Sequence, residues 1–186
     1  LVSSKNGQIN PTAQQLFEYG CVARIDAFRQ LPNGLGKANL VGESRVKIVS
    51  VKKMMPIVVE VQQLEDINAE SNVSYSKMND IKRKCKDACK FDRFFPAEVE
   101  AQILYGSLSP SQFADSLVHI LMKKVKDQQL MLAELDVEKR LDKISITLDK
   151  FIGSVVWQKQ IDDKVSQNLS KNQKEIYLRE QLHVIN

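Results

Sequence analysis

The spacing of apolar residues changes near residue 65 and divides the chain into two regions. Before that point, short runs alternate with a period of two. In residues 21–28, Cys21, Ala23 and Ile25 fall on one face of a strand, and charged side chains fall on the other. Similar runs occupy residues 38–41, 46–51 and 57–61, with breaks at 42–44 and 52–56. We therefore predict a β domain at residues 1–64, built as an antiparallel sheet or a small barrel.

A tight hairpin is predicted inside this β region. Residues 31–34 read Leu-Pro-Asn-Gly and lie between two strand-like runs. The pair Asn33-Gly34 tolerates positive φ at both central positions of a two-residue turn, so it is a strong hairpin signal. The strands on either side of it should pair directly.

After residue 65 the apolar spacing becomes helical, and we predict a helical domain at residues 65–186. Pro96 fits the first turn of a helix that stops at Gly106. Ser109 and Gln112 form the pattern of a capping box at the start of the next helix. The fold class predicted for the whole chain is therefore α+β, a sheet followed by a helical bundle.

The last helix is predicted to be unusually long. Asp136 is a suitable N-cap, no proline follows Pro110, and the helix would run from about residue 136 to residue 186. Residues 141–186 alone would span roughly 69 Å at 1.5 Å per residue. A helix of that length exceeds the domain that carries it, so we expect its distal half to project, pair or continue into another domain. Its sparse apolar positions are candidates for an assembly seam: Val165, Leu169, Ile176 and Leu182.

Composition indicates an ordinary globular chain. Hydrophobic residues make up 43% of it and charged residues 27%, which excludes wholesale disorder and disulfide-scaffold classes. No apolar run approaches the roughly 18 residues that a membrane-spanning helix needs. Three cysteines form an odd set that favours a reduced, intracellular setting. The net charge of +4 comes entirely from residues 77–93, where seven basic and three acidic residues lie.

The chain offers little enzymatic chemistry. His119 and His183 are the only histidines, and the helical patterns around them favour structural or surface roles. Neither a phosphate-binding loop nor a Gly-x-Ser-x-Gly nucleophile elbow occurs. Cys85 and Cys89 share a helix face but lack the further ligands of a zinc site. We therefore predict no catalytic, cofactor-binding or metal-binding residues. The basic cluster at residues 82–90 leaves open a solvated helix face, an acidic protein partner or nucleic acid.

Four blocks of sequence resemble the N-terminal region of Lon, the ATP-dependent serine protease. Residues 171–182 (KNQKEIYLREQL) are similar to the family's helix that leads towards the ATPase module, and this block is the most specific. Residues 130–141 resemble a second family segment. Residues 16–25 resemble a strand that reads LYEVGTVARI, and residues 31–34 with 41–45 resemble the hairpin that follows it. The blocks occur in the family's order and cover most of the chain.

The resemblance implies a PUA-like β fold or pseudo-barrel for residues 1–64, and a helical bundle ending in a long projecting helix for residues 65–186. The parent protein would be a homo-hexameric, ATP-dependent serine endopeptidase of protein quality control that uses ATP and Mg. The fragment itself would be non-catalytic, because the phosphate loop and the Ser-Lys pair would lie beyond Asn186. Because the chain starts at Leu1 rather than Met, we interpret the family's first strands as missing.

Our leading hypothesis is a domain that binds unfolded, damaged or tagged protein substrates and supports hexamer assembly. The candidate contacts are the apolar turn residues Met54, Met55 and Pro56, since methionine adapts to varied partners. Core packing is the competing role for the two methionines. The alternatives are a standalone PUA-like nucleic-acid-binding module and a purely structural oligomerisation domain. We expect no membrane partner and a cytoplasmic location, with the mitochondrial matrix as the alternative.

Overall fold

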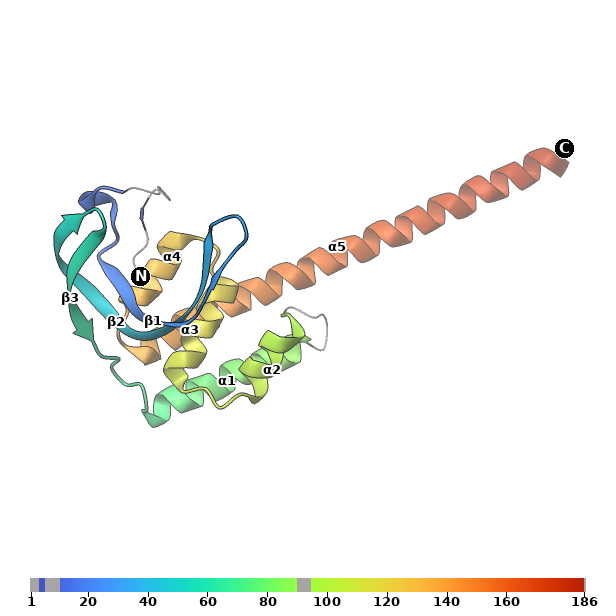
Figure 1. The fold of residues 1–186 in the computed structure, drawn as a ribbon. Helices are drawn as coiled ribbons and strands as arrows, with labels where there is room; N and C mark the ends of the chain where they lie inside the picture. Colours follow the sequence, from blue (N-terminus) through green and yellow to red (C-terminus); the bar gives the residue numbers. More distant parts are fainter. Residues whose placement is uncertain (1–3, 6–10, 90–94, 186) are drawn as a thin grey trace. The chain divides into compact units, whose positions relative to one another are not determined.

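The computed structural model describes residues 4–5, 11–89 and 95–185 (Figure 1). Side chains are described for the same residues apart from 98, 167–172 and 174–185. The chain forms two compact units, Leu1–Ile144 and Ser145–Asn186. The assignment of residues 1–64 and 65–186 to separate domains stays a prediction.

The first unit contains a three-stranded antiparallel sheet in the order β1-β2-β3. Its strands are β1 (Tyr19–Gln30), β2 (Gly36–Met54) and β3 (Ile57–Leu64). The predicted hairpin is confirmed, but residues 31–35 form its loop instead of a two-residue turn. Of the Asn-Gly pair only Gly34 has a positive φ, of 80°, and Asn33 Oδ1 accepts a hydrogen bond of 3.1 Å from the Leu35 N–H. A left-handed conformation at this position is one that glycine adopts without strain. A short 3-10 helix, η1 (Ala13–Gln15), precedes the sheet.

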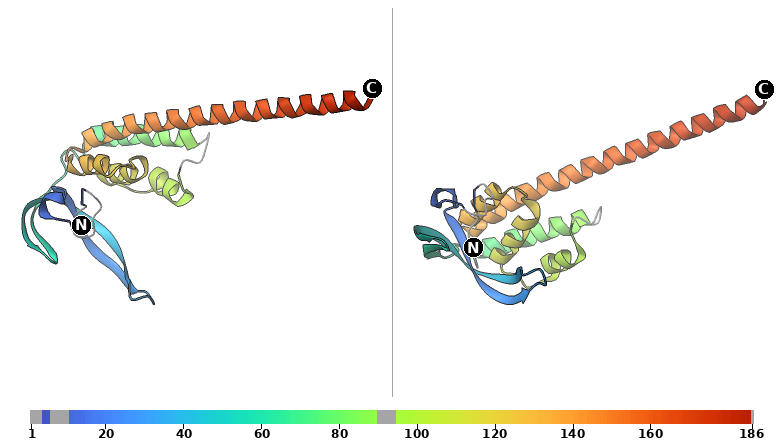
Figure 2. Two further views of the ribbon diagram at one scale, coloured as in Figure 1. Left: turned by 90° about the horizontal axis from the view of Figure 1, so that it is seen from above. Right: turned by 45° about the horizontal axis from the view of Figure 1, so that its top comes forward.

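The predicted strand break at 42–44 is wrong, because β2 runs through these residues. The predicted break at 52–56 is present but shorter, since β2 ends at Met54 and β3 begins at Ile57. The strand passes Gly42 with a register shift against β1, so one extra residue is absorbed as a bulge instead of a turn. A Cβ at position 42 would lie 3.2 Å from Cys21 Sγ, which explains a glycine within a strand. Residues 36–44 of β2 pair only with β1 and form a two-stranded arm (Figure 2).

Within the described residues, four helices lie between the sheet and the long last helix: α1 (Asn72–Cys89), α2 (Ala97–Tyr105), α3 (Pro110–Leu121) and α4 (Val125–Ala133). The boundaries predicted for two of them are confirmed. Pro96 and Gly106 flank α2, and Ser109 caps α3 with the full capping box to Gln112. Helix α4 was not predicted, because its apolar residues do not repeat along one face strongly enough to stand out in the sequence.

Apolar side chains from the helices form the core of the first unit. Helices α1 and α3 contribute fully or almost fully buried residues, and the start of α5 (Val137–Ile185) contributes three more. This packing stabilises short helices that would be marginal alone. The buried set includes Ile81, Cys85, Ile103, Phe113, Leu117, Met131, Val137, Leu141 and Ile144.

Helix α5 is continuous over 49 residues, as the sequence predicts, and would measure about 74 Å at 1.5 Å per residue. Asp136 Oδ1 accepts a hydrogen bond of 3.0 Å from the Glu138 N–H, which confirms the predicted N-cap. The helix belongs to the first unit up to Ile144 and forms the second unit beyond it. No helix within the described residues is long and apolar enough to cross a membrane.

Candidate functional site

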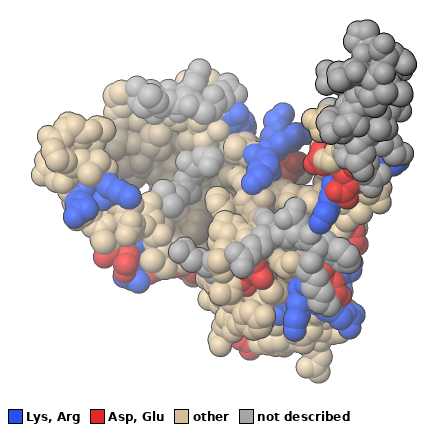
Figure 3. Space-filling model, turned by 90° about the vertical axis from the view of Figure 1, so that its right-hand side faces the viewer, with Lys and Arg blue, Asp and Glu red and all other residues tan. Residues whose placement is uncertain are grey.

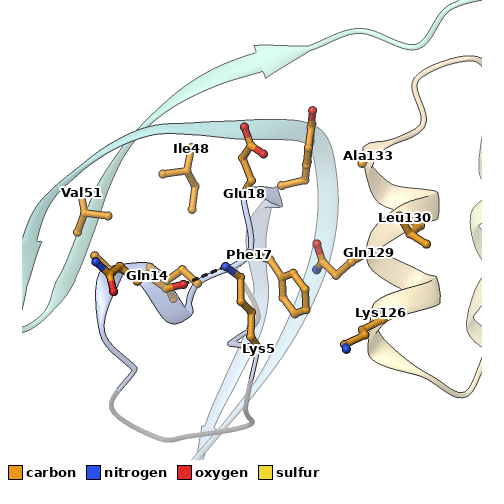
Figure 4. Close-up of a pocket in the computed structure, with 13 residues that line it drawn as sticks. Lys5, Gln14, Phe17, Glu18, Ile48, Val51, Lys126, Gln129, Leu130 and Ala133 are labelled. Carbon is orange, nitrogen blue, oxygen red and sulfur yellow. Dashed lines mark hydrogen bonds between the residues drawn. The ribbon is translucent and has the colours of Figure 1, made fainter.

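A large open cavity of about 890 Å³ lies in the first unit, between the segment before β1, strand β2 and helix α4 (Figure 4). That volume falls in the range of about 300–1,000 Å³ that is typical of ligand pockets. Figure 4 shows Phe17 and Leu130 on opposite sides of the space. Leu130 is 66% exposed, a large apolar side chain left open to solvent. We call this space the main cavity. Its apolar lining includes Leu16, Phe17, Tyr19, Ile48, Val51, Leu130 and Ala133.

Charged groups stand at the border of the main cavity. Lys5 Nζ donates a hydrogen bond of 2.9 Å to the Gln14 carbonyl, and Lys126 extends from α4 on the facing side (Figure 4). Glu18 also lines the cavity, but its carboxylate pairs with Lys47 Nζ at 3.0 Å. The hydrogen bond from Lys47 to Glu18 and the charge of that carboxylate raise the pKa of Lys47.

A second hollow of about 700 Å³ adjoins the first and shares Ala13 with it. The predicted contact residues Met54, Met55 and Pro56 all line this turn hollow, together with Ile57 and residues 11–13. Met55 is 72% exposed, so core packing, the competing role, does not apply to its side chain. The Met55–Pro56 peptide bond is cis. The sequence thus located one apolar surface but missed the larger one beside it.

A buried ionic cluster connects the sheet to the helices next to the main cavity. Arg140 of α5 is fully buried and pairs with Asp66 at 2.7 Å and with Asp115 at 2.8 Å. Arg45 of β2 pairs with the same two carboxylates and lies 3.2 Å from Asp66 Oδ1. Ser111 completes the cluster by donating to Asp66. Charged groups taken out of water need this degree of pairing.

The ionic cluster also fixes the wall of the main cavity. Arg45 Nη1 donates a hydrogen bond of 2.9 Å to the Leu132 carbonyl near the end of α4, so one side chain holds β2 and α4 together. Sequence reasoning missed all four charged members. The available signal was Arg140, which interrupts the apolar stripe of Val137, Leu141 and Ile144 with a charge.

The cysteines, the histidines and the assembly residues considered in the sequence analysis do not meet in one site. Cys85 is buried on α1, Cys89 is partly exposed, and burial, followed by the influence of Cys89, raises the pKa of Cys85 to about 12. Within the described residues, no group of three or more His, Cys, Asp or Glu side chains is arranged to hold a metal ion. His119 is exposed on α3. Val165 is 51% exposed on α5, whereas the side chains of Leu169, Ile176 and Leu182, like that of His183, lie outside the described residues.

The basic stretch of α1 is partly engaged within the chain. Lys77 pairs with Asp142 at 2.7 Å, Arg83 pairs with Asp80 at 2.8 Å, and Lys82 Nζ lies 5.6 Å above the Phe113 ring. On the face drawn in Figure 3, basic and acidic side chains alternate rather than gather in one patch. Binding of nucleic acid depends on clustered positive charge, whereas the face drawn in Figure 3 carries charges of both signs.

The fold is an α+β domain with an open cavity that has a largely apolar lining. A similar fold occurs in the N-terminal domain of the Mycobacterium avium complex Lon protease, with a TM-score of 0.57 and 17% sequence identity, over 75% of this chain and 74% of that one. Residues 1–150 match the family model of the ATP-dependent protease La (LON) substrate-binding domain, and the chain belongs to that family. The resemblance inferred from the sequence is confirmed, as is the α+β class.

Similar proteins include Lon proteases from several bacteria. The relative from Heliobacterium modesticaldum is 26% identical over 187 residues, and the one from Desulfatibacillum aliphaticivorans is 27% identical over 190 residues. Both alignments cover 100% of this chain but only 23% of the relative. The relative from Treponema pallidum is 29% identical over 95% of this chain and 20% of its own length. The chain therefore spans less than a quarter of these relatives.

Proposed function

We propose that this chain is the non-catalytic substrate-engagement region of an ATP-dependent Lon-type protease and that it holds unfolded polypeptide in the main cavity. The family description supports the binding of substrate. The observation that carries the proposal is the apolar lining of the main cavity, which remains open at Leu130. Burial of such surface contributes about 25 cal/mol per Å² of apolar area.

The turn hollow extends this surface. Because Ala13 borders both hollows, an extended segment that crosses η1 has one apolar site on each side of it. Met54 and Met55 suit the second site, since their unbranched side chains adapt to different partners. Each contact is weak, and several copies of the domain in one assembly would add avidity without new contacts.

Binding of an unfolded protein to the 186-residue chain tests the proposal. A reduced, carboxymethylated polypeptide is titrated against the chain by fluorescence anisotropy, with its folded form as the control. Leu130→Asp should weaken binding several-fold because it places a charge in the apolar lining. Ile146→Asp is the matched substitution, at a helical residue that is 57% exposed and outside both hollows, and should leave binding unchanged. Equal binding by Leu130→Asp and the unsubstituted chain would overturn the proposal.

The second unit supports a further role in assembly. Trp157, Ile161 and Val165 recur every fourth residue and are 66%, 39% and 51% exposed, so they form an apolar stripe that the chain itself leaves open. We extend this stripe through Leu169 and Ile176 to Leu182 as the seam of a homo-oligomer, a hexamer in the parent protein. The parent would be cytoplasmic and would carry the ATP, Mg and Ser-Lys chemistry outside residues 1–186.

A further inference from the structure

The positive charge at the main cavity is not neutralised by its own lining. Lys5 and Lys126 approach the cavity from opposite sides (Figure 4). The hydrogen bond of Lys5 Nζ goes to a neutral acceptor, the Gln14 carbonyl. An ammonium group carries three donors, so this bond leaves others available. Lys126 is exposed and lies in the first turn of α4, where the helix dipole adds to the positive potential.

Negative charge near the cavity is already engaged. Among the described lining residues, Glu18 is the only acidic one, and its carboxylate pairs with Lys47. Asp127 follows Lys126 on α4 but does not line the cavity. No described carboxylate forms an ion pair with Lys5 or Lys126. The main cavity thus combines an apolar lining with two lysines at its border that have no ion-pair partner among the described residues.

We propose that the main cavity selects segments of unfolded polypeptide in which a large apolar side chain lies within two residues of an aspartate or glutamate. The apolar side chain contacts the lining near Phe17 and Leu130, and the carboxylate pairs with Lys126, while Lys5 adds to the positive potential from the other side. Neighbouring Cα atoms are about 3.8 Å apart, so residues this close in sequence span one cavity. This inference rests on the proposed function and adds a charge preference to it.

Short peptides of matched sequence test the preference. Each peptide has one phenylalanine in a polar background. Its N-terminus is acetylated and its C-terminus is amidated, so that no terminal charge is present. The residue after phenylalanine is aspartate, asparagine or lysine. Anisotropy titrations with the 186-residue chain should rank affinity in that order, with aspartate about two- to fivefold tighter than asparagine, as expected for partly exposed ion pairs. Raising the salt concentration should narrow the difference.

Charge reversal in the protein completes the test. Lys126→Glu should remove or invert the preference for aspartate while the asparagine peptide still binds. Lys164→Glu makes the same change of net charge on an exposed residue of α5 and should keep the preference. Equal affinities for the aspartate and asparagine peptides, or an unchanged preference in Lys126→Glu, would overturn this inference and leave the proposed function standing. Failure of all the peptides to bind would overturn both.

Discussion

Arg140 Nη1 lies 2.8 Å from Asp115 Oδ1, and through this pair the start of α5 is joined to α3. The same Asp115 carboxylate pairs with Arg45 of β2, so one acidic group receives cations from the sheet and from α5. Arg45 in turn bonds the carbonyl of Leu132 beside the main cavity. The wall of the proposed binding site and the origin of the long helix therefore share one set of ionic contacts.

Removal of Arg140 should destabilise the first unit. Arg140→Met leaves Asp66 and Asp115 with a single cation, and we expect the free energy of unfolding to fall by about 3 kcal/mol, the lower end of the range for broken buried pairs. The lower end applies because Asp115 is half exposed. Urea unfolding followed by circular dichroism measures the change.

Lys139→Met is the matched control for this substitution. Lys139 precedes Arg140, is 65% exposed, and lies 3.7 Å from Asp136. Its replacement should cost less than about 1 kcal/mol, as for other surface pairs. If the free energy of unfolding falls by the same small amount in both variants, the ionic cluster does not stabilise the fold as described.

Acid should weaken the fold through Glu134. Its hydrogen bond with Lys143, at 3.0 Å, is the main cause that lowers the pKa of Glu134 below 4.5. The unfolded chain therefore takes up a proton first as the pH falls. The stabilisation is complete above pH 4.5 and is lost progressively below it.

Glu134→Gln and Lys143→Met should each reduce this loss of stability, and the double variant should behave like either single one. Urea midpoints at about pH 6 and about pH 3 provide the comparison. Additive effects of the two substitutions would show that the residues act independently, contrary to the contact described.

The Cys85 thiol should resist modification in the folded chain. It is completely buried, and its pKa is raised to about 12, so the reactive thiolate is scarce at neutral pH. Iodoacetamide at about pH 8 should label Cys21 and Cys89 before Cys85. Mass spectrometry of peptides from a timed reaction gives the order, and early labelling of Cys85 would contradict its placement.

The same raised pKa predicts a loss of stability in alkali. The unfolded thiol ionises near pH 9.0 while the folded one keeps its proton, so the contribution of Cys85 to stability declines as the pH rises from 9.0 towards about 12. Cys85→Ala should show a smaller decline over that range. An identical pH dependence in the two proteins would show that Cys85 keeps no such proton.

Self-association should depend on the apolar stripe of the second unit. Ile161→Asp and Val165→Asp place charges on it and should shift the chain towards monomer in sedimentation equilibrium. Ser166→Asp places the same charge on an exposed neighbouring residue outside the stripe and should not. A chain that remains monomeric at high concentration without any substitution would remove the role proposed for this helix.

Elements governed by neighbours in sequence were predictable. The Asn33-Gly34 turn, the Ser109 cap and the Asp136 cap each depend on a few adjacent residues, and all three are observed. The passage of β2 through Gly42 was not predictable in this way, because it depends on the approach of Cys21 from another strand.

The candidate site was harder to predict for the same reason. Met54, Met55 and Pro56 are consecutive, so their apolar turn was visible in the sequence. Phe17 and Leu130 are more than one hundred positions apart and meet only across the folded main cavity. The ionic cluster likewise combines residues from β2, α3, α5 and the loop after β3.

Site-specific photo-crosslinking shows most directly whether unfolded polypeptide binds in the main cavity and the turn hollow. A photoreactive residue is placed at position 130, 55 or 146 of the 186-residue chain, and each protein is irradiated with an unfolded polypeptide. Positions 130 and 55 line the two hollows, whereas position 146 is a comparably exposed apolar residue outside them. We predict crosslink yields at positions 130 and 55 that far exceed the yield at position 146. Equal yields at all three positions would contradict it.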